Sequence, residues 1–190
     1  MMTPAVFFDR DGTVIEQVHY LNRVDQVQLL PGAAKTIDEI RTMGFKVVIV
    51  TNQAVIGKGL LTVEGLHDIQ AEFDRQLKAE GTFVDAWYYC PEVRTAPDRV
   101  SIDHPDRKPG PGMLLRGAKE HGLDISESWM VGDMLSDTLA GRNAGCKATV
   151  LVRTGLAESS DSDHSSVDHT VSDITLVPDL IRKAQQENKT

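Results

Sequence analysis

Short apolar runs alternate with longer helical stretches along this chain, and that alternation constrains its fold more than any other feature. Runs with the length and composition of buried strands occur at residues 5–8, 46–50, 86–89, 129–131 and 149–152. Stretches with helix signals lie between them, at residues 31–44, 62–81, 113–122 and 136–145. Strands that alternate with helices pair in parallel and are covered on both faces. The pattern therefore predicts an α/β fold with a doubly wound, Rossmann-like parallel sheet.

The length of 190 residues suits one domain with a single core. We expect residues 1–190 to form that domain, with no large cap domain inserted into it. Residues 158–168 are rich in Ser and Asp and are predicted to be a flexible acidic loop. A short strand near Thr170 and a helix from Pro178 are expected to complete the domain.

The formal net charge of −8 limits the partners that the chain can bind. Nucleic acid and anionic membranes would repel it, so we expect a small-molecule partner, no nucleic-acid or membrane partner, and a monomer. No run approaches 18 apolar residues, and the first residues lack the features of a secretory signal, which predicts a cytoplasmic protein. Cys90 and Cys146 are too few for a disulfide scaffold and are expected to be reduced thiols.

Polar residues suited to phosphate follow three of the predicted strands. Asp9 and Asp11 follow the first strand, Thr51 follows the second and Asp133 follows the fourth. The carboxyl ends of parallel strands lie at one edge of the sheet, where open α/β folds bind their ligands. A polar turn would account for Asp11 and Gly12 alone, but it would not account for the convergence of three strand ends. The sequence therefore predicts a functional site at this edge.

Phosphoryl transfer needs a nucleophile, a divalent cation and positive donors, because phosphate esters repel anions. Asp9 is the predicted nucleophile, which would form an aspartyl phosphate. Asp11 is predicted to protonate the leaving oxygen and then to activate water. Mg²⁺ prefers a few oxygen ligands, which suits Asp9, Asp133 and the backbone carbonyl of Asp11, with Asp137 in support. Lys108 supplies a cation close to the same edge.

These elements resemble the four ordered motifs of the haloacid dehalogenase superfamily. The matching segments are Asp9-Arg10-Asp11-Gly12-Thr13, Thr51, Lys108 and Gly132-Asp133 with Asp137. Phosphotransferring members have the second aspartate of the first motif and dehalogenating members lack it, so the resemblance implies a phosphatase. It also implies that Thr51 and Lys108 hold the transferring phosphoryl group.

Over residues 5–155 the chain is similar to the heptose bisphosphate phosphatase family within that superfamily. The similar segments are residues 9–13, 43–45, 51–53, 88–91, 107–115, 130–133 and 150–155. This resemblance implies Mg²⁺-dependent release of one phosphate from a small phosphorylated sugar, leaving the 1-phosphate. Histidinol-phosphate phosphatases and other small phosphomonoester phosphatases remain as alternatives.

The same resemblance implies a set of substrate-binding residues. They are Gln17, His19, Tyr20, Asn52, Gln53, Ala54, Arg107 and Lys108. Arg107 is expected to clamp the phosphate that is not removed, because a guanidinium fork matches phosphate oxygens. For His19 and Tyr20, a plain surface loop is the competing interpretation.

Departures from the family pattern affect what can be carried over. The family has a zinc loop patterned Cys-x-His and Cys-x-Cys, whereas this chain has Cys90, Glu92, His104 and Asp106 at the corresponding positions. Zinc accepts all three residue types, but a metal-free loop held by packing is the favoured interpretation, so Mg²⁺ is the expected cofactor. Met134 follows Asp133 where a cationic residue is usual, which removes a charge that could meet the substrate.

Two rival functions remain. A nucleic-acid 3′-phosphatase would share the aspartate chemistry, but it would need a basic groove, and the acidic balance of the chain opposes that. A binding module that has lost catalysis would be expected to have a damaged first motif. Asp9 and Asp11 are intact, which favours an active enzyme.

Overall fold

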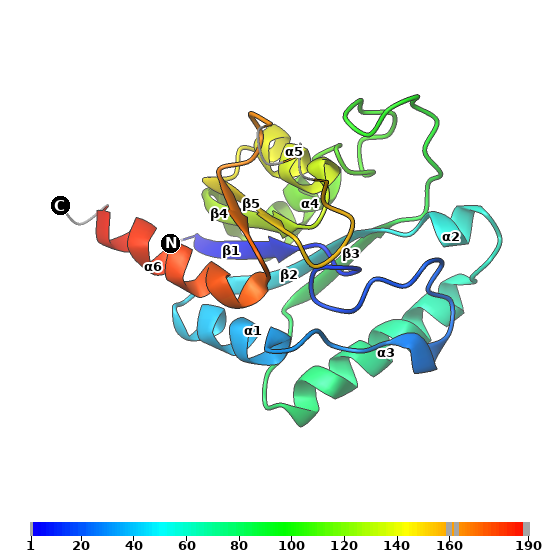
Figure 1. Cartoon of the computed structure of the whole chain (residues 1–190), viewed down its shortest axis with the longest axis horizontal. Coiled ribbons are helices and arrows are strands. Elements are labelled where there is room, and N and C mark those ends of the chain that lie inside the picture. Colours follow the sequence, from blue (N-terminus) through cyan, green and yellow to red (C-terminus); the bar gives the residue numbers. More distant parts are fainter. Residues whose placement is uncertain (1, 159–160, 162–163, 188–190) are drawn as a thin grey trace.

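The computed structural model describes residues 2–158, 161 and 164–187, and this part of the chain forms a six-stranded sheet covered by helices (Figure 1). Neighbouring strands all pair in parallel, in the order β3-β2-β1-β4-β5-β6. Their bounds are β1 Thr3–Phe8, β2 Lys46–Asn52, β3 Ala86–Cys90, β4 Leu123–Gly132, β5 Ala148–Val152 and β6 His169–Val171. The predicted doubly wound parallel sheet is confirmed.

Helices lie on both faces of the sheet (Figure 1). One face packs against α1, α3 and α6, and the other packs against α4 and α5. The helices are α1 Ala33–Thr42, α2 Ala54–Gly57, α3 Val63–Ala79, α4 Gly112–His121, α5 Leu135–Ala144 and α6 Val177–Glu187, with 3₁₀ turns at Val24–Gln26 and Ile174–Leu176. Both cores are apolar, as expected for a sheet that is buried on both sides.

The central strand β1 divides its side chains between the two cores. Val6 and Phe8 face the core below α1 and α3, whereas Ala5 and Phe7 face the core below α4. All four are fully buried, because alternate residues of a strand point to opposite faces and both faces of this strand are covered. The uninterrupted apolar run that predicted the strand is thus a consequence of two-sided burial.

Local signals fix the helix ends where the sequence predicts them. Thr62 caps α3, accepting a hydrogen bond from the backbone N–H of Gly65 at 3.1 Å. Gly122 and Gly145 end α4 and α5 with φ angles of 62° and 86°, which glycine adopts without steric cost.

Strand β4 begins six residues before the predicted run at 129–131. Its first residues pair with Thr3 and Pro4, and the register then shifts before Trp129 pairs with Val6. The early part carries polar residues such as Asp124 and Glu127, so it has no apolar signal, and only the pairing with β1 identifies it as a strand.

The order of the strands creates a crevice at the carboxyl end of β1. The chain runs outward from β1 through β2 to β3 and then returns to the other side of β1 as β4. Parallel α/β sheets bind ligands at such a reversal.

No described helix is long and apolar enough to cross a membrane. Part of the acidic loop predicted at 158–168 lies outside the described residues.

Candidate active site

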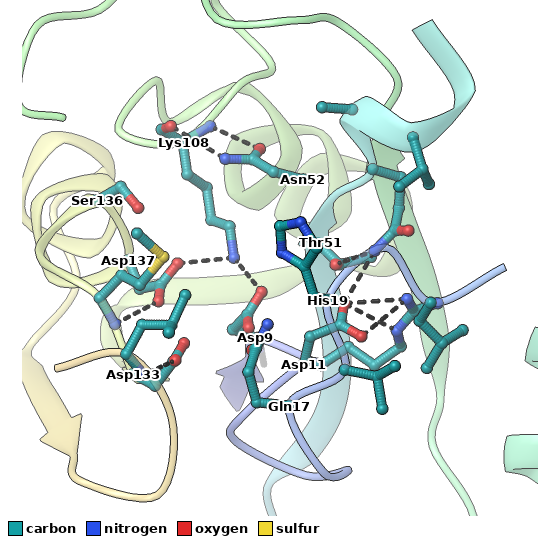
Figure 2. A pocket seen from close by; sticks show the side chains of 18 of the residues that line it. Asp9, Asp11, Gln17, His19, Thr51, Asn52, Lys108, Asp133, Ser136 and Asp137 are labelled. Atoms are coloured by element: carbon teal, nitrogen blue, oxygen red, sulfur yellow. Dashed lines mark hydrogen bonds and ion pairs between the residues drawn. The ribbon is translucent and has the colours of Figure 1, made fainter. Parts of the chain in front are cut away.

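Three adjacent strands deliver the predicted residues to one cavity. Asp9 follows β1, Thr51 lies near the end of β2, and Asp133 follows β4. All three line a cavity of about 230 Å³ at the carboxyl edge of the sheet (Figure 2). The convergence expected from the strand pattern is therefore present in the tertiary structure.

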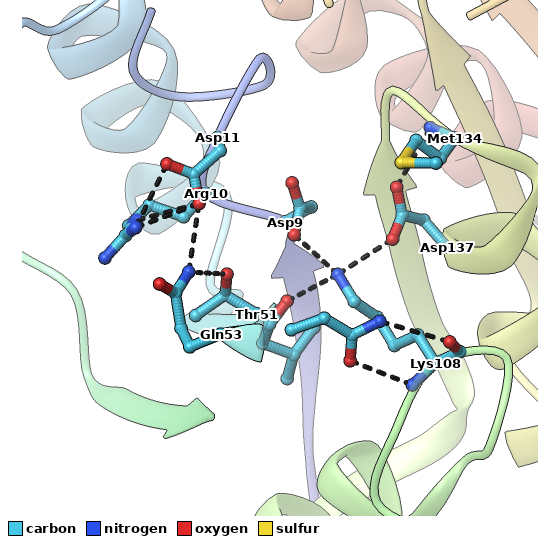
Figure 3. Close-up of polar contacts among 10 residues, drawn as sticks. Asp9, Arg10, Asp11, Thr51, Gln53, Lys108, Met134 and Asp137 are labelled. Atoms are coloured by element: carbon cyan, nitrogen blue, oxygen red, sulfur yellow. Dashed lines mark hydrogen bonds and ion pairs between the residues drawn. The ribbon is translucent and has the colours of Figure 1, made fainter. Parts of the chain in front are cut away.

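Lys108 reaches into this cavity from the irregular segment before α4, which comprises residues 91–111. Its Nζ lies 2.5 Å from Asp9 Oδ1 and 2.8 Å from Asp137 Oδ1, and it donates to the carbonyl of Val50 at 2.8 Å (Figure 3). The side chain is almost completely buried. A buried ammonium needs such partners, because its desolvation is costly.

The carboxylates of the cavity outnumber the cations that face them. Burial raises the pKa of Asp9 well above its ordinary value. The Lys108 ammonium acts to lower this pKa, but the neighbouring carboxylates of Asp137 and Asp133 raise it further. Burial, assisted by Asp137, raises the pKa of Asp133 to about 7. Burial acts to lower the pKa of Lys108, but Asp137 and Asp9 raise it above its ordinary value. The ammonium therefore stays charged, and the site has room for more positive charge.

Asp9, Asp133 and Asp137 have the donor set that Mg²⁺ prefers. One carboxylate oxygen of each lies within 4.8 Å of the others, and within the described ranges no other His, Cys, Asp or Glu residues form such a group. Hard oxygen ligands with access to water suit Mg²⁺, so these residues fit that ion. Asp137, predicted only to support the site, is a full member of the group.

Two glycines allow the chain to pass close to Asp133. A Cβ atom at Gly12, where φ is +77°, would lie 2.6 Å from Asp133 Oδ2, and one at Gly155 would overlap the same oxygen. That oxygen also accepts a hydrogen bond of 2.7 Å from the backbone N–H of Leu156. Both positions require glycine for the same reason, which is that backbone must approach the carboxylate closely.

Asp11 is held by two neighbours in the cavity wall. Arg10, almost completely buried, donates to its carboxylate from Nη2 at 2.9 and 3.0 Å and from Nε at 3.2 Å. Gln53 Nε2 donates to Asp11 Oδ2 at 3.0 Å and to Thr51 Oγ1 at 2.8 Å (Figure 3). Sequence reasoning missed this role of Arg10. A charged residue between two predicted functional aspartates was the available signal.

Most of the predicted substrate-binding residues line the cavity. They are Gln17, His19, Tyr20, Asn52, Gln53, Ala54 and Lys108. The lining also includes Val18, Leu21, Val55, Met134, Ser136 and Leu156. Asn52 has a further role, because its amide brackets the backbone of Lys108, accepting from the N–H at 3.0 Å and donating to the carbonyl at 3.1 Å.

Arg107 does not line this cavity. Its Nη1 donates to the carbonyl of Glu92 at 2.6 Å, and the side chain is buried. Burial lowers the pKa of the guanidinium, and nearby Arg94 acts in the same direction. The predicted clamp on a second phosphate therefore remains a prediction, and in this structure Arg107 holds the irregular segment instead.

The four residues of the degenerate zinc loop do not form a metal-binding group. Cys90 Sγ lies 3.9 Å from His104 Nδ1, but that nitrogen also accepts from the backbone N–H of Asp106, and the Asp106 carboxylate pairs with Arg116 at 2.6 Å. No three of Cys90, Glu92, His104 and Asp106 meet within ligand reach in the part of the chain that the structure describes. The donors do not fit a closed zinc site.

We expect Mg²⁺ to raise the unfolding temperature more at about pH 8 than at about pH 6, because protons compete with the ion for the same carboxylates. The pKa of Asp133 is about 7 when folded and 3.8 ordinarily. The metal-free folded protein therefore binds more protons than the unfolded chain between these values, and it loses stability as the pH rises through them.

Thermal melts with Mg²⁺ or with a chelator at the two pH values measure this effect. An Asp133→Asn variant is the matched control and should lose most of the difference. An equal Mg²⁺-induced shift at both pH values would contradict the interpretation.

Comparison with known proteins identifies relatives of the chain. The family model for HAD-hydrolase-like proteins matches residues 106–177. D-glycero-β-D-manno-heptose-1,7-bisphosphate 7-phosphatase of Pasteurella multocida is 35% identical over 95% of this chain and 98% of its own length. The enzyme of the same name from Escherichia coli K12 is 33% identical over 96% of each chain. The solved D,D-heptose 1,7-bisphosphate phosphatase of B. bronchiseptica, complexed with magnesium and phosphate, superposes with a TM-score of 0.82 at 28% identity, over 95% of this chain and 99% of that one.

Proposed function

The chain belongs to the haloacid dehalogenase-like hydrolases, in the family of heptose bisphosphate phosphatases, and from that membership we propose that it hydrolyses D-glycero-D-manno-heptose 1,7-bisphosphate to the 1-phosphate. The enzyme is a phosphoric monoester hydrolase that depends on Mg²⁺. The B. bronchiseptica relative, which was solved with magnesium and phosphate and covers nearly all of this chain, supports the same cofactor here.

The observation that carries this proposal is the position of Asp9. Its carboxylate lies at the end of the central strand, 2.5 Å from the Lys108 ammonium and within reach of the carboxylates of Asp133 and Asp137. A buried carboxylate is a useful nucleophile toward phosphorus only where cations absorb the negative charge of the phosphoryl group. Lys108 supplies one such charge, and Asp133 and Asp137 are placed to hold another.

The reaction proceeds in two displacements. A carboxylate oxygen of Asp9 attacks phosphorus as the bond between phosphorus and the sugar oxygen breaks, and the product is an aspartyl phosphate. Asp11, in its protonated form, gives its proton to the leaving sugar oxygen and then, as a carboxylate, accepts a proton from the attacking water. That water releases inorganic phosphate and restores Asp9.

Asp11 must exchange partners to perform this step. In the structure its carboxylate faces Arg10 and Gln53 (Figure 3). Rotation toward the leaving oxygen replaces these contacts by one with the substrate. Arg10 and Gln53 therefore hold the Asp11 carboxylate until the sugar phosphate enters.

The remaining residues hold the phosphoryl group. Lys108 donates a charged hydrogen bond to its oxygens, and the Thr51 hydroxyl, which accepts from Gln53 Nε2 at 2.8 Å, can donate another. Asp9, Asp133 and Asp137 would hold Mg²⁺, and the ion would supply positive charge that offsets the repulsion between carboxylate and phosphate. Preorganised charges of this kind stabilise the transition state because they need no reorientation during the reaction.

Phosphate release from four substrates, measured side by side with Mg²⁺, tests the proposal. The four are heptose 1,7-bisphosphate, histidinol phosphate, fructose 1,6-bisphosphate and a 3′-phosphorylated oligonucleotide. We expect kcat/KM to be highest for the heptose and activity to disappear when Mg²⁺ is chelated. A preference for histidinol phosphate or for the oligonucleotide would contradict the substrate assignment while leaving the aspartate chemistry in place.

A further inference from the structure

A bisphosphate, the substrate of the proposed function, brings two anionic groups to a cavity that is itself rich in carboxylates. Asp9, Asp11, Asp133 and Asp137 all line it. The lysine and arginine that line it, Lys108 and Arg10, are both paired with these carboxylates. The phosphate that is transferred can share Lys108 and the bound cation. The phosphate that is retained needs a positive group elsewhere. The need for such a group rests on the proposed function, because only a bisphosphate substrate retains a phosphate.

The family resemblance implies two positions for this charge, and neither presents a cation to the cavity in this structure. Position 134, next to Asp133, is occupied by methionine and lines the cavity without a charge. Arg107 is turned to the carbonyl of Glu92 and lies outside the cavity lining. A cation that lies at the rim of the cavity and has no carboxylate partner could bind the retained phosphate.

Lys58 meets that description. Its Nζ donates to the Tyr20 hydroxyl at 2.9 Å and lies 4.7 Å from the centre of the Tyr20 ring. The side chain is exposed, and it makes no ion pair with any residue that the structure describes. Tyr20 lines the cavity, so the ammonium of Lys58 stands beside its rim. The loop after β1 and the turn after α2, which supply the two residues, lie side by side (Figure 1).

The backbone of Tyr20 has an uncommon conformation. Its φ is 55°, and it has the only positive φ of any non-glycine residue among those described. Such a conformation is unfavourable for a bulky side chain and persists where the surroundings enforce it, commonly at ligand sites. The His19 ring lies 4.0 Å from the Tyr20 ring, between centroids. Together, His19, Tyr20 and Lys58 form a rim cluster.

We propose that Lys58 binds the phosphate that the substrate retains. The cavity of about 230 Å³ is below the roughly 300 to 1,000 Å³ usual for small-ligand sites, so the far end of a bisphosphorylated sugar extends to the rim cluster. A lysine ammonium binds phosphate as a point charge and keeps three donors free to reorient. The Tyr20 hydroxyl positions the Lys58 ammonium before the sugar binds. Once Lys58 moves to the phosphate, the Tyr20 hydroxyl can also donate a hydrogen bond to a phosphate oxygen. Lys58 is thus the specificity determinant for a second phosphate in this chain.

The test compares heptose 1,7-bisphosphate with heptose 7-phosphate, which lacks the retained phosphate. In Lys58→Ala we expect the ratio of kcat/KM for the two to fall by about 10- to 100-fold, the range for losing hydrogen bonds to a charged group, mostly through KM for the bisphosphate. Lys58→Arg should recover most of the ratio, because it keeps the charge. Lys183→Ala, an exposed lysine on α6, removes the same charge away from the cavity and should leave the ratio unchanged.

The outcomes separate this inference from the proposed function. If the wild-type enzyme cleaves neither heptose ester, the proposed function fails and this inference fails with it. If the wild-type enzyme prefers the bisphosphate but Lys58→Ala keeps that preference, only the role of Lys58 is overturned. If Arg107→Ala loses the preference for the bisphosphate while Lys58→Ala behaves as wild type, Arg107 and not Lys58 binds the retained phosphate. Unfolding temperatures of all variants exclude misfolding as the cause of a lost preference.

Discussion

Asp9→Asn is expected to abolish phosphate release while the protein keeps its fold. The amide has the same shape as the carboxylate but is a far poorer nucleophile, and loss of a nucleophile lowers kcat by about four orders of magnitude or more. Phosphate release with Mg²⁺, using the best substrate of the panel, measures the effect. Asp9→Ala should be equally inactive, which excludes reversion of the amide to the acid as a source of residual turnover.

The same substitution is expected to leave the metal-free protein at least as stable as the wild type. Burial and the nearby carboxylates raise the pKa of Asp9 even though the Lys108 ammonium acts to lower it, so the ionised form of Asp9 is unfavourable in the folded state without a bound Mg²⁺. A neutral amide removes that cost and can still accept a hydrogen bond from Lys108. Thermal melts in a chelator measure this, and circular dichroism confirms the fold. Turnover close to the wild-type rate in either variant would refute the assignment of Asp9 as the nucleophile.

Lys108→Met is expected to remove both activity and a large part of the stability. The ammonium is buried and contacts the carboxylates of Asp9 and Asp137 and the carbonyl of Val50. Removing one partner of a buried charge pair usually costs about 3–5 kcal/mol, because the remaining charges stay desolvated and uncompensated. For a chain of this length that corresponds to a fall in unfolding temperature of roughly 10 °C. kcat should also fall by about 10²- to 10³-fold, since a preorganised charge at the phosphoryl group is lost.

Second variants separate charge from packing as the cause. In Lys108→Met combined with Asp137→Asn, one uncompensated carboxylate is removed, so part of the lost stability should return while activity stays low. Mg²⁺ should also raise the unfolding temperature of Lys108→Met more than that of the wild type, because the cation replaces the missing positive charge. An unfolding temperature for Lys108→Met equal to that of the wild type would show that the ion pairs contribute little.

The sequence alone determined the architecture and the centre of the site. Uninterrupted apolar runs predicted buried parallel strands, and Gly122 and Gly145 predicted helix ends, because each signal acts within a few residues of itself. Asp9, Thr51 and Asp133 could be grouped because they follow strands of one parallel sheet, whose carboxyl ends share an edge.

Only the tertiary structure decided which side chains fill the spaces around that centre. Lys108 reaches Asp9 across 99 residues of chain, Lys58 reaches Tyr20 across 38, and Gln53 reaches Asp11 across 42. The irregular segment before α4 turned Arg107 toward a backbone carbonyl and away from the cavity. The pattern of apolar residues specifies strands and helices, but it carries no information on the path of a loop. Loop paths depend on many weak contacts between distant segments, so the contacts that Lys58 and Arg107 make could not be predicted from the sequence.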